Sequence, residues 1–171
     1  GDAYTREESN PGKWAENYKF PAVDKGLVRC VEIPHKHQVG MQGFAFNTRR
    51  DIFQDPRVRR ALTYAFDFDW LNKNIFYGAY TRTTSFFDNT DLAAKGLPQG
   101  KELALLEPFR DQLPKEVFED VYTLPTFEKG PRENLRIAHS LLKEAGWIMK
   151  DGKLVNEKTG KPFVFEIILN I

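Results

Sequence analysis

Five arginines lie within residues 49–60 and form the densest group of side chains that could bind phosphate or nucleic acid. The group consists of Arg49, Arg50, Arg57, Arg59 and Arg60. A nucleic-acid surface needs unopposed positive charge and exposed aromatic side chains on which bases can stack. Aspartates at positions 51, 55, 67 and 69 lie among these arginines or follow them closely. This pattern favours local ion pairs, with a cytoplasmic phosphate- or nucleic-acid-binding module using the Arg49–Arg60 cluster as the alternative.

The charge balance of the whole chain agrees with the structural interpretation. Its 171 residues include 25 Lys plus Arg and 24 Asp plus Glu, which gives a formal net charge of +1. A protein that neutralises a run of phosphates usually carries a basic excess over the whole domain. Any phosphate-binding surface would therefore have to be local.

Two histidines, His35 and His37, are spaced as metal ligands could be, but a metal site needs three or four ligands. The third histidine, His139, falls in a predicted helix, and Cys30 is the only cysteine. We therefore predict no metal site and no internal disulfide. Cys30 lies in the apolar run LVRCVEI, which predicts a buried and unreactive thiol.

The sequence contains no recognisable catalytic set. Asp67 and Asp69 could form a carboxylate pair, but two positions apart on one helix they diverge by about 200°. The chain has no glycine-rich phosphate loop, no dinucleotide fingerprint and no nucleophile elbow. We predict no catalytic residues, no cofactor and no enzymatic activity.

The elements that must position these residues alternate between helices and strands, which predicts an α/β fold. Residues 26–33 and 41–47 are rich in β-branched and aromatic residues and are predicted strands. Residues 1–25 are polar, interrupted by prolines, and predict an irregular arm or linker. Residues 79–100 predict a long connection, of a kind that is often functional.

Two amphipathic helices are predicted. Asp55 can cap the first and Pro56 suits its first turn, after which it continues to Gly78. Its apolar stripe begins with Val58, Ala61, Leu62, Ala65 and Phe66. The second runs from Pro131 to a stop at Gly146. Its apolar stripe is Leu135, Ala138, Leu141, Leu142 and Ala145. A further helix over 101–113 is interrupted at Pro108, and a short one follows Pro114.

The end of the sequence predicts a hairpin and a strand. Asp151–Gly152 is a typical two-residue hairpin turn, and the apolar run FVFEIILNI then continues to Ile171. A strand this apolar should have partners. We therefore expect the chain to be a fragment truncated at Ile171. No apolar run is long enough to predict a membrane span.

Two blocks of the sequence resemble the extracellular solute-binding proteins of family 5, the periplasmic dipeptide- and oligopeptide-binding receptors of ABC importers. The first block is GFAFNTRRDIFQDPRVRRALTYAFD, in which Phe66 replaces the isoleucine more usual in the family. The second is RIAHSLLKEAGWIMKDGKLVNEKTGKPFVFEIIL. The segments ENYKFPAV, FYGAYTRTTSFFDN and GLPQGKELALLEPFRDQLP are most similar to the Yej-type branch, implicated in peptide and microcin C uptake.

The resemblance implies a type II periplasmic-binding-protein-like lobe, with a mixed sheet and flanking helices. Residues 26–171 would form part of the C-terminal lobe of a longer, two-lobed protein. It would capture peptides in the periplasm by hinge closure and deliver them to permease and ATPase subunits. A signal peptide is expected upstream, with no nucleic-acid partner and no membrane span in this chain.

The resemblance also places one segment near the ligand cleft. The predicted strand over 41–47 contains Gln42, Phe44, Phe46 and Asn47, which are the candidate ligand-binding residues. The loop over 80–87 is a second candidate segment. The alternative is that the four residues only build the sheet.

Overall fold

The computed structural model describes residues 4–121 and 123–169. The chain divides into two compact units. The first unit combines residues 1–43 with 71–124, and the second combines 44–70 with 125–171.

The first unit contains short helices separated by long extended segments. They are α1 (Pro11–Asn17), α2 (Pro21–Asp24), α6 (Gly100–Leu106), the 3-10 helix η1 (Glu107–Gln112) and α7 (Glu116–Glu119). The arm was predicted to be irregular, but Pro11 and Pro21 start helices there, because proline suits a first turn. The predicted interruption at Pro108 is confirmed, since α6 ends at Leu106 and η1 follows it.

The predicted strands over 26–33 and 41–47 are wrong for this chain, because neither segment has regular secondary structure. A strand exists through hydrogen bonds to a neighbouring strand. Within the described ranges, residues 29–33 and 41–46 make no such backbone bonds. Cys30 is consequently exposed rather than buried.

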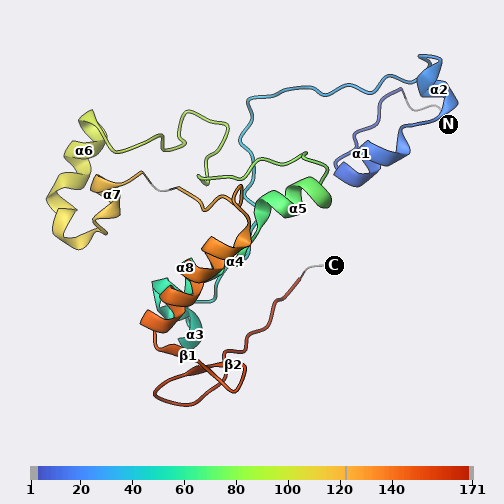
Figure 1. Cartoon of the computed structure of the whole chain (residues 1–171). Helices are drawn as coiled ribbons and strands as arrows, with labels where there is room; N and C mark the ends of the chain where they lie inside the picture. The colour runs from blue at the N-terminus through green and yellow to red at the C-terminus, as the bar shows by residue number, and fades with distance from the viewer. Residues whose placement is uncertain (1–3, 122, 170–171) are drawn as a thin grey trace. The chain divides into compact units, whose positions relative to one another are not determined.

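The second unit is built on two helices that lie side by side, α4 (Pro56–Ala65) and α8 (Pro131–Glu144) (Figure 1). The short helix α3 (Asp51–Gln54) precedes α4. Phe53, Val58 and Trp147 form the buried centre, and Val58 is 0% exposed. The partly buried side chains around them are Phe46, Ile52, Leu62, Leu142, Ala145, Leu154 and Phe163.

The predicted end of α8 and the hairpin after it are confirmed. Gly146 adopts φ +82°, and its N–H donates to the carbonyl of Lys143 at 2.9 Å. Strands β1 (Trp147–Lys150) and β2 (Lys153–Asn156) then pair antiparallel. Asp151 (φ +51°) and Gly152 (φ +75°) form the turn, with the positive φ angles that a two-residue hairpin requires.

Two details of the predicted helices are wrong. Leu135 is 49% exposed, whereas Asn134 is buried and its Nδ2 donates to the carbonyl of Thr126 at 2.8 Å. The first helix also ends at Ala65, because Phe66 is extended (ψ 100°), and α5 (Phe68–Asn74) begins anew. The buried amide shows that a hydrogen bond can decide which side of a helix faces the interior.

The described sheet is smaller than the mixed sheet predicted. It consists of β1 and β2, extended by one antiparallel bridge between Val155 and Pro162. The predicted final strand is not formed over residues 163–169, which have no regular secondary structure, and its last two positions, Asn170 and Ile171, lie outside the described residues. Helices and strands are both present, as predicted. Among the described helices, none is long and apolar enough to span a membrane.

Candidate functional site

The four predicted ligand-binding residues differ in how far their side chains are available. Gln42 is exposed, and Phe44 is 58% exposed with its ring edge-on to Phe66 at 6.0 Å. Phe46 is half-buried, because its ring packs on Phe53 at 5.2 Å. Gln42, Phe44 and Asn47 are therefore the three that are exposed, whereas Phe46 contributes to the interior of the second unit.

Asn47 has a local structural role. Its Oδ1 accepts a hydrogen bond from the backbone N–H of Arg49 at 3.2 Å, and from Nε of Arg49 at 3.4 Å. Its carbonyl accepts from the N–H of Arg50 at 3.0 Å. The side chain thus forms the turn that leads from the extended segment into α3.

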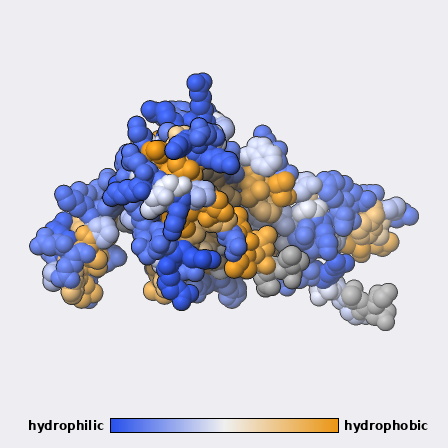
Figure 2. All heavy atoms as spheres, turned by 90° about the horizontal axis from the view of Figure 1, so that it is seen from below, coloured by the Kyte–Doolittle hydropathy of each residue, from blue (hydrophilic) through white to orange (hydrophobic). Residues whose placement is uncertain are grey.

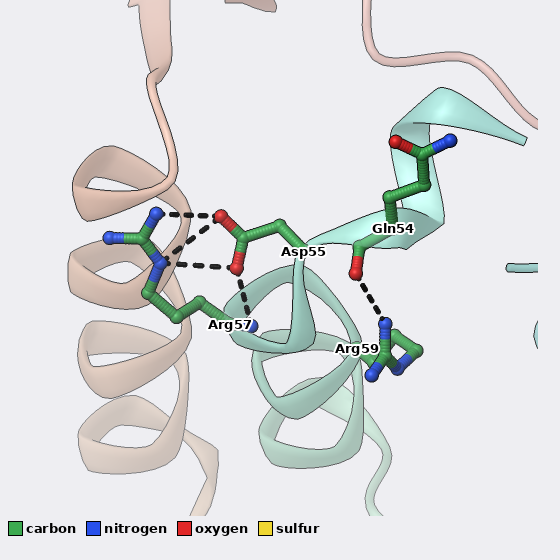
Figure 3. Close-up of polar contacts among 4 residues, drawn as sticks. All are labelled: Gln54, Asp55, Arg57 and Arg59. Atoms are coloured by element: carbon green, nitrogen blue, oxygen red, sulfur yellow. Dashed lines mark hydrogen bonds and ion pairs between the residues drawn. The ribbon is translucent and has the colours of Figure 1, made fainter.

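Asp55 caps α4 as predicted, and it also binds Arg57 (Figure 3). Oδ1 of Asp55 accepts from the backbone N–H of Arg57 at 2.8 Å. The Arg57 guanidinium returns to the same carboxylate, with Nη2 at 2.6 Å from Oδ2 and Nε at 3.1 Å from both oxygens. These bonds hold the pKa of Asp55 below its usual value, and that of Arg57 above it.

Arg59 joins α3 to α4. Its Nη1 donates to the carbonyl of Phe53 at 2.6 Å. It also donates to the carbonyl of Gln54 at 2.8 Å (Figure 3). Carbonyls at the end of a helix have no partner within the helix, so the guanidinium satisfies the end of α3. The sequence pattern instead predicted local ion pairs for this cluster, because the short helix α3 was not predicted.

Three of the five clustered arginines are therefore engaged within the protein itself. Arg49 donates to the side-chain oxygen of Asn47, Arg57 is bound by a carboxylate and Arg59 by two carbonyls. These contacts occupy some of the guanidinium N–H groups that a phosphate would otherwise bind. The geometry favours the structural interpretation of the cluster.

Asp67 and Asp69 also serve backbone groups rather than a shared substrate. Oδ1 of Asp67 accepts from the N–H of Trp70 at 2.9 Å, at the start of α5. Oδ2 of Asp69 accepts from the N–H of Phe127 at 2.8 Å, which ties α5 to the chain entering α8. Each carboxylate thus has its own structural partner.

A second candidate region lies in the first unit, where the loop after Phe86 meets the histidines. The Asn89 amide donates to the carbonyls of His35 at 2.9 Å and His37 at 2.7 Å. Nε2 of Gln38 donates to the carbonyl of Phe86 at 3.1 Å. The two imidazole rings lie 5.5 Å apart. Over the described ranges, no group of three or more His, Cys, Asp or Glu could hold a metal ion.

The model of one protein family, described as "Bacterial extracellular solute-binding proteins, family 5 Middle", matches residues 1–170. The chain is 43% identical over 169 residues to the "Probable peptide-binding protein YejA" of Agrobacterium fabrum. It is 47% identical over 168 residues to the "Uncharacterized protein y4wM" of Sinorhizobium fredii. It is 40% identical over 164 residues to the "Peptidoglycan-binding protein YepA" of Agrobacterium fabrum.

These alignments cover most of this chain but a minor part of each relative. They include 96%, 95% and 94% of the chain, against 28%, 25% and 26% of the three relatives. The chain therefore spans just over a quarter of the length of the curated relatives that it matches.

Proposed function

Because this chain belongs to the bacterial extracellular solute-binding proteins of family 5, we propose that it is part of a receptor that captures peptides for an ABC importer. The observation that carries the proposal is the match over residues 1–170, together with a relative named as a probable peptide-binding protein at 43% identity. The receptor acts in the periplasm, is directed there by a signal peptide encoded upstream, and delivers its ligand to permease and ATPase subunits. It binds and does not catalyse.

We further propose that residues 26–171 belong to the C-terminal lobe of a two-lobed, type II periplasmic-binding architecture, with residues 1–25 leading into it. Peptide capture occurs by hinge closure, in which main-chain hydrogen bonds hold an extended ligand and pockets accept its side chains. Gln42 and Phe44 contact the ligand, since both are exposed, and Phe46 and Asn47 hold their segment in place.

The test uses the protein expressed from the complete reading frame that contains these residues. Isothermal titration calorimetry with a set of short peptides is expected to show saturable binding, and mass spectrometry is expected to find peptides that co-purify. Phe44→Ala should weaken binding about 10-fold, the size expected when one aromatic contact is lost. Phe109→Ala, which removes a similarly exposed ring (51%) from η1, is the matched control and should bind normally.

Two results would contradict the proposal. One is the absence of binding to any peptide, and the other is an equal loss of affinity in Phe44→Ala and Phe109→Ala. Because one relative is named a peptidoglycan-binding protein, soluble peptidoglycan fragments form a second arm of the titration. Binding confined to those fragments would narrow the ligand to peptides attached to amino sugars.

A further inference from the structure

A hollow at the start of α8 is lined by four charged side chains, those of Lys129, Arg132, Glu133 and Arg136. Its volume is about 350 Å³, at the lower end of the range for small-molecule sites. The surface of the chain also includes large apolar patches, orange in Figure 2. The lining of this hollow, in contrast, indicates a charged ligand rather than an apolar one.

The backbone that carries these side chains is held from its inner side. Phe127 is buried, and its N–H donates to Oδ2 of Asp69 at 2.8 Å. The carbonyl of Phe127 accepts from the N–H of Gly130 at 2.8 Å, which closes the turn that contains Lys129. The buried amide of Asn134 in α8 donates to the carbonyl of the residue before Phe127, also at 2.8 Å. These bonds fix the turn against α8, so a ligand does not have to order the backbone of the hollow.

The three cations of the hollow differ from the arginines at the junction of α3 and α4. Lys129, Arg132 and Arg136 are exposed, and none of them forms an ion pair within the described ranges. Arg57 and Arg59 are instead bound by a carboxylate and by two carbonyls. Residues four apart on a helix have Cβ atoms about 5–6 Å apart, so Arg132 and Arg136 can reach the same group. Their guanidinium N–H groups are available to it.

The outer face of α8 continues the positive charge of the hollow. Four exposed residues fall within about 60° of one another around the helix, namely Arg132, Arg136, His139 and Lys143. The buried positions of α8 lie on the opposite side of the helix. A row of like charges on one face raises the local concentration of oppositely charged groups. An anionic group is therefore attracted toward the hollow along this face.

We propose that the hollow at the start of α8 binds a phosphate group, with Arg132 and Arg136 donating to its oxygens and Lys129 beside them. Paired N–H donors make arginine well suited to phosphate. The three cations and Glu133 leave an excess of two positive charges. A phosphate monoester, with a charge of about −1.5 to −2 at neutral pH, matches this excess better than a carboxylate does.

The site accommodates one phosphate group rather than a nucleic acid. Nucleic-acid affinity depends on many basic contacts along a backbone, and the hollow supplies three cations. The phosphate belongs either to a free solute or to a lipid headgroup. The site shares no residue with the candidate ligand-binding segment 42–47, so the proposal does not depend on which peptide the receptor binds.

Calorimetric titration of the protein made from the complete reading frame tests the site, with inorganic phosphate and acetate as probes at one ionic strength set by NaCl. Phosphate is expected to bind saturably and about 10-fold or more tightly than acetate. Arg132→Gln combined with Arg136→Gln should weaken phosphate binding about 10-fold or more. Lys150→Gln combined with Lys153→Gln is the matched control, because it removes the same number of exposed positive charges from the hairpin. It should change the affinity by less than about 2-fold.

A second arm distinguishes the two sources of the phosphate group, using vesicles of phosphatidylcholine with and without phosphatidic acid. Cosedimentation that requires phosphatidic acid and is lost with Arg132→Gln and Arg136→Gln identifies a lipid headgroup. Binding of inorganic phosphate without cosedimentation identifies a free solute. Absence of binding in both arms, equally tight binding of acetate, or equal losses in the two double variants would overturn the proposal. Peptide binding should be unchanged in all these variants, so failure of this site leaves the proposed function in place.

Discussion

At the scale of single residues, the sequence QDPRVRR organises the junction between α3 and α4. Asp55 caps the start of α4 and holds the Arg57 guanidinium, while Arg59 satisfies the carbonyls at the end of α3. The function of these charges is thus to connect two helices that meet at a sharp bend. Asp55 is the residue on which both the cap and the ion pair depend.

The ion pair predicts how stability depends on pH. Arg57 lowers the pKa of Asp55 in the folded state, so the carboxylate contributes stability above its unfolded pKa of about 3.9. That contribution should be lost as the pH falls through the lower, folded pKa. Asp55→Asn keeps a capping oxygen but removes the charge. The stability difference between the parent protein and Asp55→Asn, measured by urea denaturation from pH 7 to pH 2, should therefore shrink as the pH falls.

A constant difference in stability between the parent protein and Asp55→Asn from pH 7 to pH 2 would show that the charge of Asp55 contributes nothing to stability. Asp51→Asn is the matched control. Asp51 is exposed at the start of α3, and Asp51→Asn removes one carboxylate charge while leaving the Asp55–Arg57 ion pair in place.

At the scale of elements, local sequence signals predicted where helices begin and end and where the hairpin turns. Whether a segment forms a strand depends instead on pairing with distant residues. Asp55–Pro56, Gly146 and Asp151–Gly152 act through their own backbone preferences, so the sequence alone identified them. Strands over 26–33 and 41–47 would need hydrogen bonds to a neighbouring strand, and the described residues 29–33 and 41–46 make none. Composition shows that such a segment can form a strand, but it does not supply the partner.

The same distinction between local signals and long-range pairing explains why the candidate site differs from its prediction. The sequence pattern predicted residues 41–47 as one strand, in which alternate side chains would share a face. Because this segment has no hydrogen-bonded partner strand, packing determines which of its side chains are buried. Phe46 lies against Phe53, and Phe44 remains exposed. The Asn89 contacts with His35 and His37 were not predicted, because they join loops 52 and 54 positions apart.

Gly146 allows a test of the helix stop in which an added Cβ would not clash with other parts of the described chain. It adopts φ +82°, and a Cβ built there would meet nothing within 4 Å. Gly146→Ala should therefore destabilise the protein by about 1–2 kcal/mol, the cost of placing a residue with a Cβ in the left-handed region. Gly40→Ala is the control, since a Cβ there also meets nothing and φ lies outside the left-handed region. Urea denaturation curves of the two variants would agree only if the conformation of Gly146 were unimportant.

At the scale of the whole molecule, charge balance and the arginine contacts both argue against a nucleic-acid-binding surface. The chain carries 25 basic and 24 acidic residues, and Arg57 and Arg59 are bound within the protein. Nucleic-acid affinity comes largely from the release of counterions by many basic contacts. In this chain the positive and negative charges nearly balance, and part of the arginine cluster is bound within the protein. It therefore lacks the many free basic contacts that would release counterions from nucleic acid.

The protein is therefore expected not to be retained on a double-stranded DNA column at about 0.15 M salt. Arg49→Ala and Arg50→Ala together, which remove two exposed charges from the cluster, should leave this behaviour unchanged. Retention at about 50 mM salt that disappears by about 200 mM, and that the double variant abolishes, would instead support a phosphate-binding surface. Neither arginine takes part in the junction held by Asp55 and Arg59, and the double variant removes one side-chain contact at the turn before α3, the 3.4 Å hydrogen bond from Nε of Arg49 to Asn47.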